Sequence, residues 1–249
     1  MGGMISVVTV VFNNVHTIGN TIDSVLGQSY SDKEHVVVDG GSTDGTLRLL
    51  SDRSSELDRF VSEPDNGIYD ALNKGLTLAS GDIVGFLHAD DVYACDGVLA
   101  AVASVFEDSS VAAVYGDLEY VQKDNIYNVV RHWKSSNFSH RKLVNGWMPP
   151  HPTLYVRKEW YNRIGGFNTE YRIAADYLSV LQLFSHPEFK AVYIPNVFVK
   201  MRVGGASNRS LRNIIQKTSE DYRALRQTGV GGVGALVFKN LSKFGQFIH

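Results

Sequence analysis

Two adjacent carboxylates close an apolar run in the first half of the chain. The run from Ile83 to Leu87 is β-rich and leads through His88 to Asp90 and Asp91. Neighbouring negative charges repel each other unless a cation or a donor-rich ligand lies between them. The pair therefore predicts a divalent metal site whose other ligand is a diphosphate. The alternative is that Asp91 or Asp96 caps the helix that follows.

A second polar turn follows the strand-like segment His35 to Val38. It contains Asp39, two glycines and Ser42. Glycines let a ligand approach the backbone, and an aspartate there can accept hydrogen bonds from a base or a ribose. The alternative is an ordinary turn in which Ser42 or Thr43 caps a helix. Both can hold together, because capping does not occupy Asp39.

A third polar run, Glu63 to Gly75, predicts a turn that leads into a helix. Asp70 and Lys74 fall on one side of that helix at helical spacing. Lys74 can face a phosphate as a point charge. It can equally form an i, i+4 ion pair with Asp70 in solvent.

The elements that position these turns alternate between strand and helix. Such an order predicts an α/β fold with a mixed, mostly parallel sheet flanked by helices. Ligands of these sheets bind beyond the carboxyl ends of the strands, where the polar turns fall. The predicted strands are Ile5–Phe12, His35–Val38, Phe60–Ser62, Ile83–Leu87 and Val111–Tyr115.

The second half is less regular, and we divide the chain at 1–115, 116–209 and 210–249, the last a C-terminal helical extension. Its apolar tail predicts an amphipathic helix on a membrane surface, or one packed on the domain or at a dimer contact. The expected elements are a hairpin of Leu118–Gln122 and Ile126–Arg131, a loop over Ser136–Pro150, a strand at Thr153–Val156, helices at Lys158–Ile164 and Ala175–Phe184, an extended Ala191–Val203 and a helix from about Ser210 to Gln227.

The composition limits the possible function classes. The 249 residues are 44% hydrophobic and 20% charged, as in a soluble globular protein, and the net charge of −2 provides no basic field for nucleic acid. The single cysteine, Cys95, excludes a disulfide framework, and we expect it to be a small buried thiol. The N-terminal residues lack signal-peptide features, and no apolar run reaches the ~18 residues of a membrane span. We therefore expect a cytoplasmic protein.

Several ordered motifs together resemble family 2 glycosyltransferases. They are Val8–Asn13, Ser24–Tyr30, Val37–Thr46, Asn66–Gly75 and the Asp90-Asp91 pair, and the resemblance extends over roughly residues 4 to 210. It implies an inverting GT-A-fold enzyme that takes the sugar of a nucleotide-sugar donor, UDP first and GDP second. The resemblance is greatest to bacterial enzymes of O-antigen, capsule and exopolysaccharide synthesis. It therefore implies an acceptor saccharide linked to polyprenyl diphosphate, and a site on the cytoplasmic face of the inner membrane.

The resemblance also implies roles for individual residues. Asp91 would hold Mn²⁺ or Mg²⁺ on the diphosphate, and Asp90 would contact the ribose or share the metal. Two positions depart from the family pattern, because Gly40 and His88 stand where many relatives have an acid. Arg202 lies in a glycine-containing segment expected to close on the diphosphate. The implied donor-binding residues are Thr9, Phe12, Asn13, Asp39, Asp70, Lys74, His88, Asp90 and Arg202.

An inverting transfer needs a base to take the proton of the acceptor hydroxyl. Asp176 resembles the family's base at the start of a helix, with an N-cap aspartate as the alternative. His151 and Trp147 are the expected acceptor contacts, with core packing as the alternative for Trp147. Two other function classes remain at this point: a nucleotidyltransferase acting on sugar phosphates, and a sugar-nucleotide-binding module without catalysis.

Overall fold

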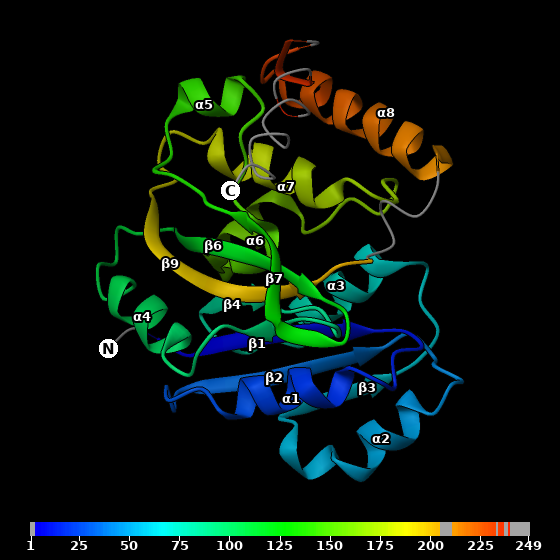
Figure 1. Cartoon of the computed structure of the whole chain (residues 1–249). Coiled ribbons are helices and arrows are strands. Elements are labelled where there is room, and N and C mark those ends of the chain that lie inside the picture. The colour runs from blue at the N-terminus through cyan, green and yellow to red at the C-terminus, as the bar shows by residue number, and fades with distance from the viewer. Residues whose placement is uncertain (1–2, 205–210, 233, 237–238, 240–249) are drawn as a thin grey trace.

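A computed structural model describes residues 3–204, 211–232, 234–236 and 239, and it contains one sheet and eight α-helices within these residues (Figure 1). The strands are β1 (Ile5–Val11), β2 (Lys33–Asp39), β3 (Arg59–Ser62), β4 (Ile83–Phe86), β5 (Val92–Tyr93), β6 (Ala113–Gln122), β7 (Asn125–Trp133), β8 (Tyr155–Arg157) and β9 (Ala191–Arg202). The helices are α1 (Ile18–Leu26), α2 (Thr46–Asp52), α3 (Ile68–Leu78), α4 (Val98–Val105), α5 (His140–Val144), α6 (Lys158–Ile164), α7 (Ala175–Phe184) and α8 (Leu211–Thr228).

The sheet is mixed, as predicted. Its order is β3-β2-β1-β4-β8-β6-β9-β5, and β7 pairs with β6 outside this path. The four strands from β3 to β4 run parallel, whereas β8 is antiparallel to both β4 and β6. The carboxyl ends of β1, β2 and β4 therefore meet at one edge. The loop after β1, the turn at Asp39 and the acidic pair are brought together there.

Helices cover both faces of the sheet because its central strands are apolar on both sides. Along β1, Val8 and Val10 belong to a core cluster that includes residues of α3, α6 and α7. Val11 belongs to a cluster with residues of α1 and α2. Successive side chains of a strand point to opposite faces, so one continuous apolar strand supports both layers.

Three local predictions differ from the structure. The predicted strands Val111–Tyr115 and Leu118–Gln122 are parts of one strand, β6, which has register irregularities near Gly116. A Cβ at Gly116 would lie 2.6 Å from the Phe198 ring, so this glycine permits β9 to approach rather than ending the strand. The helix α5 lies inside the expected loop 136–150, and Cys95 is exposed rather than buried.

The helix α8 runs beside α7 and shares its core (Figure 1). Ala224 and Leu225 of α8 are fully buried in the largest cluster, and Ala235 is buried there as well. The described part of the predicted tail helix therefore packs on the domain, while residues 233, 237–238 and 240–249 lie outside the described residues. Among the helices that the structure describes, none has the length and apolar character needed to cross a membrane.

Candidate active site

The loops after β1 and β2 are tied together at the edge of the sheet. Asn13, directly after β1, has φ 49°, a left-handed conformation uncommon outside glycine. Its backbone N–H donates to Ser42 Oγ at 2.8 Å, and its Oδ1 accepts from Thr43 N at 2.8 Å. Asn13 therefore holds the two loops in one arrangement, and its predicted place at the donor site is at their junction.

Asp39 organises the second loop. Its carboxylate is fully buried and accepts from Ser42 Oγ at 2.5 Å, Ser62 Oγ at 2.6 Å and the backbone N–H groups of Gly41 and Ser42. Four hydrogen-bond donors therefore hold this carboxylate, and with it the loop, in one position. The capping alternative for Ser42 and Thr43 is not what occurs, because Gly45 precedes α2 without a side-chain cap.

An acid from another loop occupies the space beside Gly40. A Cβ built on Gly40 would lie 2.4 Å from Asp65 Oδ2 and 3.4 Å from the ring of Phe12. Asp65 therefore places a carboxylate next to the position where many relatives carry their second acid. Phe12 is 63% exposed at the same edge, so its ring face is open to a ligand.

The acidic pair does not cap a helix. The helix α4 begins at Val98 after Gly97 and has no side-chain cap. Asp91 is fully buried, and neither of its carboxylate oxygens has a hydrogen-bond partner. Burial raises the pKa of Asp91 well above its ordinary value, and Asp90 raises it further, while the backbone and guanidinium of Arg202 oppose this rise.

Arg202 supports the loop that carries the acidic pair. Its Nη1 donates to the backbone carbonyl of Asp90 at 2.5 Å, and its Nε donates to the carbonyl of Lys123 at 3.0 Å. The side chain is 6% exposed at the end of β9. The structure thus places Arg202 against the backbone of the acidic loop, while residues 205–210 of the predicted closing segment lie outside the described residues.

The acidic loop fits a divalent cation shared with a ligand. The described residues contain no group of three His, Cys, Asp or Glu side chains that could hold a metal by themselves. The carboxylates of Asp90 and Asp91 would supply hard oxygen ligands to a cation. Both carboxylate oxygens of Asp91 are buried and accept no hydrogen bond, so they are available for this role. Mg²⁺ and Mn²⁺ take such carboxylates together with phosphate oxygens and water.

Two histidines lie close to this loop and to each other. The rings of His88 and His151 are 6.2 Å apart, and His151 stacks on Phe86 at 5.6 Å. Burial lowers the pKa of His151 to about 4, so its ring is neutral at pH 7. Burial also lowers the pKa of His88, against the opposing charges of Asp90 and Asp176. Both ring nitrogens of His151 are buried without a hydrogen-bond partner.

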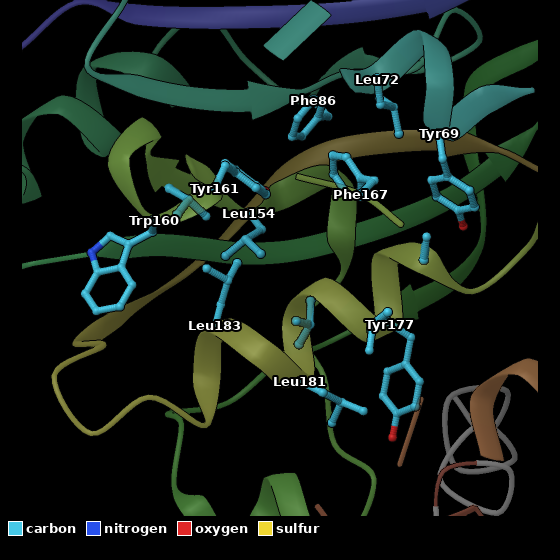
Figure 2. Packing of buried hydrophobic residues seen from close by; sticks show 14 of the residues in the cluster. Tyr69, Leu72, Phe86, Leu154, Trp160, Tyr161, Phe167, Tyr177, Leu181 and Leu183 are labelled. Carbon is cyan, nitrogen blue, oxygen red and sulfur yellow. The ribbon is translucent and has the colours of Figure 1, made fainter. Parts of the chain in front are cut away.

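Asp176 completes the group from the other half of the chain. It lies in the first turn of α7, and Ala174 precedes the helix without a side-chain cap, so the N-cap alternative for Asp176 is wrong. Tyr69 on α3 donates its hydroxyl to Asp176 Oδ1 at 3.1 Å. Figure 2 shows Tyr69 extending from α3 with its hydroxyl directed away from that helix. This bond joins the two halves across the site.

The sequence patterns predicted no role for Tyr69 or Asp65, whereas helical spacing predicted roles for the nearby Asp70 and Lys74. Lys74 Nζ pairs with Glu63 at 2.9 Å and lies 3.8 Å from Asp70, so these side chains form a local ion cluster. The Tyr69 position has a simple signal, since it follows Gly67-Ile68 on the face of α3 that must be buried.

Two predicted contacts are engaged by other parts of the protein: Thr9 is buried, and Trp147 is partly buried against the core. Thr9 is fully buried in β1, where its hydroxyl hydrogen-bonds with His35 Nε2 at 3.0 Å. Because the hydroxyl of Thr9 is buried and already hydrogen-bonded, Thr9 is not part of the donor site that we propose. Trp147 packs against Tyr115, Phe138 and Phe184 at ring distances of 5.7 to 5.9 Å, as its core-packing alternative predicts.

Known proteins are similar to this chain in sequence and in fold. The family model described as glycosyl transferase family 2 matches residues 6–166. An uncharacterised glycosyltransferase of Mycobacterium tuberculosis is 34% identical over 181 residues, which is 72% of this chain and 68% of that protein. A PGL/p-HBAD biosynthesis glycosyltransferase of Mycobacterium bovis is 31% identical over 210 residues, 82% of this chain and 79% of that protein.

Solved structures give the same fold. The Staphylococcus aureus TarS fragment 1–349 in complex with UDP-GlcNAc has a TM-score of 0.72 at 17% identity, covering 91% of this chain and 66% of that one. The Pyrobaculum calidifontis mannosyltransferase in complex with GDP-Man and Mn²⁺ has a TM-score of 0.66 at 22% identity, covering 98% of this chain and 74% of that one. The chain therefore belongs to glycosyl transferase family 2 and is a sugar-transferring enzyme with a GT-A fold.

Proposed function

We propose that this enzyme transfers a sugar from a nucleotide-sugar donor to a saccharide acceptor with inversion at the anomeric carbon and with a divalent metal. The observation that carries the proposal is the position of Asp176. It is hydrogen-bonded to Tyr69 and close enough to influence the titration of both His88 and His151. A carboxylate thus lies near the two histidines beside the acidic loop, a place that suits a base for an incoming hydroxyl.

The reaction needs one proton transfer and one displacement. The acceptor oxygen attacks the anomeric carbon, the bond from that carbon to the diphosphate oxygen breaks, and the bonding electrons leave with the nucleoside diphosphate. Asp176 takes the proton of the acceptor hydroxyl. A cation held by Asp90 and Asp91 would neutralise the charge that develops on the leaving diphosphate.

Donor recognition is assigned to the first and second loops. Phe12 offers an exposed ring to the base, and Asp65, which lies beside Gly40 as Phe12 does, is the proposed acceptor for base or ribose groups. Asp39 is proposed to serve the donor site by holding the loop through its four hydrogen bonds. UDP is the first choice for the nucleotide and GDP the second, since TarS binds UDP-GlcNAc and the Pyrobaculum enzyme binds GDP-Man. Lys74, Asp70 and His88 are proposed neighbours of the phosphates.

The acceptor is proposed to be a saccharide carried on a lipid diphosphate, used at the cytoplasmic face of the membrane. The resemblance of the ordered motifs to bacterial enzymes of O-antigen, capsule and exopolysaccharide synthesis supports this class. Ile214 and Ile215 on α8 are 47% and 71% exposed, an apolar surface that suits contact with a lipid headgroup region. His151, with two unpartnered ring nitrogens, is the proposed acceptor-side contact.

A thermal-shift panel of UDP- and GDP-sugars with and without Mn²⁺ tests the proposal. Donor at 100 times its Kd stabilises the folded protein by about 2.7 kcal/mol, or roughly 5–10 °C for a chain of this length. Asp91→Asn is expected to lose the Mn²⁺-dependent part of the shift. Asp176→Asn should keep the shift and lose turnover at least ~100-fold.

The exposed acid Asp124, in the turn between β6 and β7, provides the control. Asp124→Asn should behave as the unmodified enzyme in both assays. Product from an α-linked donor is expected to show a β-anomeric proton by NMR. Retained configuration, or normal turnover by Asp176→Asn, would contradict the proposed mechanism.

A further inference from the structure

The carboxylate of Glu220 on α8 binds the backbone that leads into α7. Glu220 accepts hydrogen bonds from three consecutive N–H groups: Arg172 at 3.1 Å, Ile173 at 2.8 Å and Ala174 at 3.0 Å. Gln216, one turn earlier on α8, donates its amide to Glu220 Oε1 at 2.9 Å. The side chain of Glu220 is 8% exposed, so these bonds are largely shielded from water.

These bonds order the backbone just before a helix that has no side-chain cap of its own. The first N–H groups of a helix have no partner within the helix, and a side chain of the preceding residue usually provides one. Ala174 stands at that place before α7 and has no polar side chain. Burial by itself would raise the pKa of Glu220, but the hydrogen bonds from Ile173, Gln216 and Arg172 outweigh burial and lower it.

The same helix holds the residues just before this segment. The hydroxyl of Tyr171 donates to Gln227 Oε1 at 2.9 Å, and the guanidinium of Arg223 lies 4.5 Å from the centre of the Tyr171 ring. The segment from Tyr171 to Ala174 is therefore anchored to α8 at four successive residues, Tyr171 by its side chain and the other three by their backbone N–H groups. Asp176 follows two residues later, and Tyr69 holds its carboxylate from the opposite side.

We propose that Glu220 is a positioning residue for the transfer step: by fixing the backbone of residues 172–174, it sets the place of the Asp176 carboxylate relative to the acceptor hydroxyl. This inference rests on the proposed role of Asp176 as the base. A general base must lie within hydrogen-bond reach of its proton, and a misplacement of about 1 Å can cost on the order of 100-fold in rate.

The test uses Glu220→Ala, the milder Glu220→Gln and a matched control on the next residue. Asp221 is also buried on α8, but its hydrogen bonds go to Lys217 at 3.0 Å and Lys239 at 2.9 Å. Asp221→Asn therefore disturbs the same helix without touching the backbone of residues 172–174. Amide hydrogen exchange, kcat and the KM for donor are measured for each folded variant.

In Glu220→Ala, the amides of residues 172–174 are expected to exchange at least ~10-fold faster, and kcat is expected to fall by roughly 10- to 100-fold with the donor KM within about 3-fold. Glu220→Gln keeps one carbonyl acceptor and should recover most of that loss. In Asp221→Asn, kcat should stay within about 2-fold. Added to Asp176→Asn, Glu220→Ala should cause no further loss, because positioning matters only while the base is present.

Two results separate this inference from the proposed function. If Asp176→Asn is inactive while Glu220→Ala retains both amide protection and kcat, the positioning role is wrong and the base assignment stands. An equal loss from Glu220→Ala with and without Asp176 would also overturn the positioning role, since Glu220 would then act on something else. Normal turnover by Asp176→Asn would instead overturn the base assignment.

Discussion

At the scale of single residues, burial changes the pKa of a histidine in the sheet. His35, in β2, is 1% exposed and hydrogen-bonds with Thr9. Burial lowers the pKa of His35 from its ordinary 6.5 to about 3, and the nearby charge of Arg53 adds to this shift. The folded protein therefore keeps His35 neutral at a pH where the unfolded chain binds a proton.

The sign of this shift predicts a loss of stability in mild acid. Below pH 6.5 the unfolded chain binds the proton and the native state does not, so the free energy of unfolding falls as the pH decreases toward 3. The slope due to His35 approaches about 1.4 kcal/mol per pH unit. Urea unfolding at pH 7.5 and 5.0 should show a smaller pH dependence for His35→Leu than for the unmodified protein.

The exposed His140 serves as the comparison. His140→Gln should keep the full pH dependence, because the side chain of His140 lies in solvent and not in the core. An unchanged pH dependence in His35→Leu would mean that His35 does not provide the effect. The upper pH range also separates His35 from Glu34, whose lowered pKa acts only below its ordinary value of 4.5.

At the scale of elements, close approach determines how α3 lies on the sheet. Gly75 stands on the inner face of α3, where a Cβ would lie 2.3 Å from Cγ1 of Val8 in β1. Val8 is 1% exposed and β-branched, so it has little freedom to move aside. The distance between α3 and β1 therefore depends on this glycine, and α3 carries Tyr69 to Asp176.

Gly75→Ala is expected to destabilise the fold although alanine favours a helix. The overpacking cost of about 1–3 kcal/mol exceeds the gain of up to about 1 kcal/mol in helix propensity. Denaturant unfolding measures the difference. Gly97→Ala is the matched control, because a Cβ at Gly97 meets nothing within 4 Å. Equal stability of the two variants would show that Val8 can yield.

At the scale of the whole molecule, the C-terminal helix belongs to the main core. Ala224, Leu225 and Val230 share one buried cluster with β1, α3 and α7. The predicted division at residue 209 thus separates parts of the sequence that bury a common surface. The boundary at 115 remains a prediction about function, because most of the proposed donor residues precede it and the proposed acceptor contact His151 follows it. The boundary at 209 remains a prediction as well.

Truncation tests how far the fold depends on α8. A chain that stops after Gly204 loses the buried residues of α8, among them Leu225, whose side chain by itself is worth on the order of 2–5 kcal/mol. Its melting temperature should fall by roughly 10 °C or more. A chain that stops after Lys239 serves as the comparison and should melt within a few degrees of the full chain. Equal melting temperatures would make α8 an independent addition.

Much of this molecule was predictable from local sequence patterns. Apolar runs and helical periodicity predicted β1, β4, α6 and α7 to within a residue or two, because burial on one or both faces dictates these patterns. The order of elements predicted a mixed sheet and the meeting of polar turns at its edge. The ordered motifs also placed the chain in its family, which the family model confirms.

Contacts between distant parts of the chain required the tertiary structure. Asp65 beside Gly40, Tyr69 on Asp176 and Glu220 on the backbone before α7 join residues that no periodicity relates. The sequence determined that two adjacent acids would end a buried strand, because strand and turn patterns are local. The structure decided that Asp91 has no hydrogen-bond partner for its carboxylate and that Asp176 does, since the neighbours of a side chain depend on how distant elements pack.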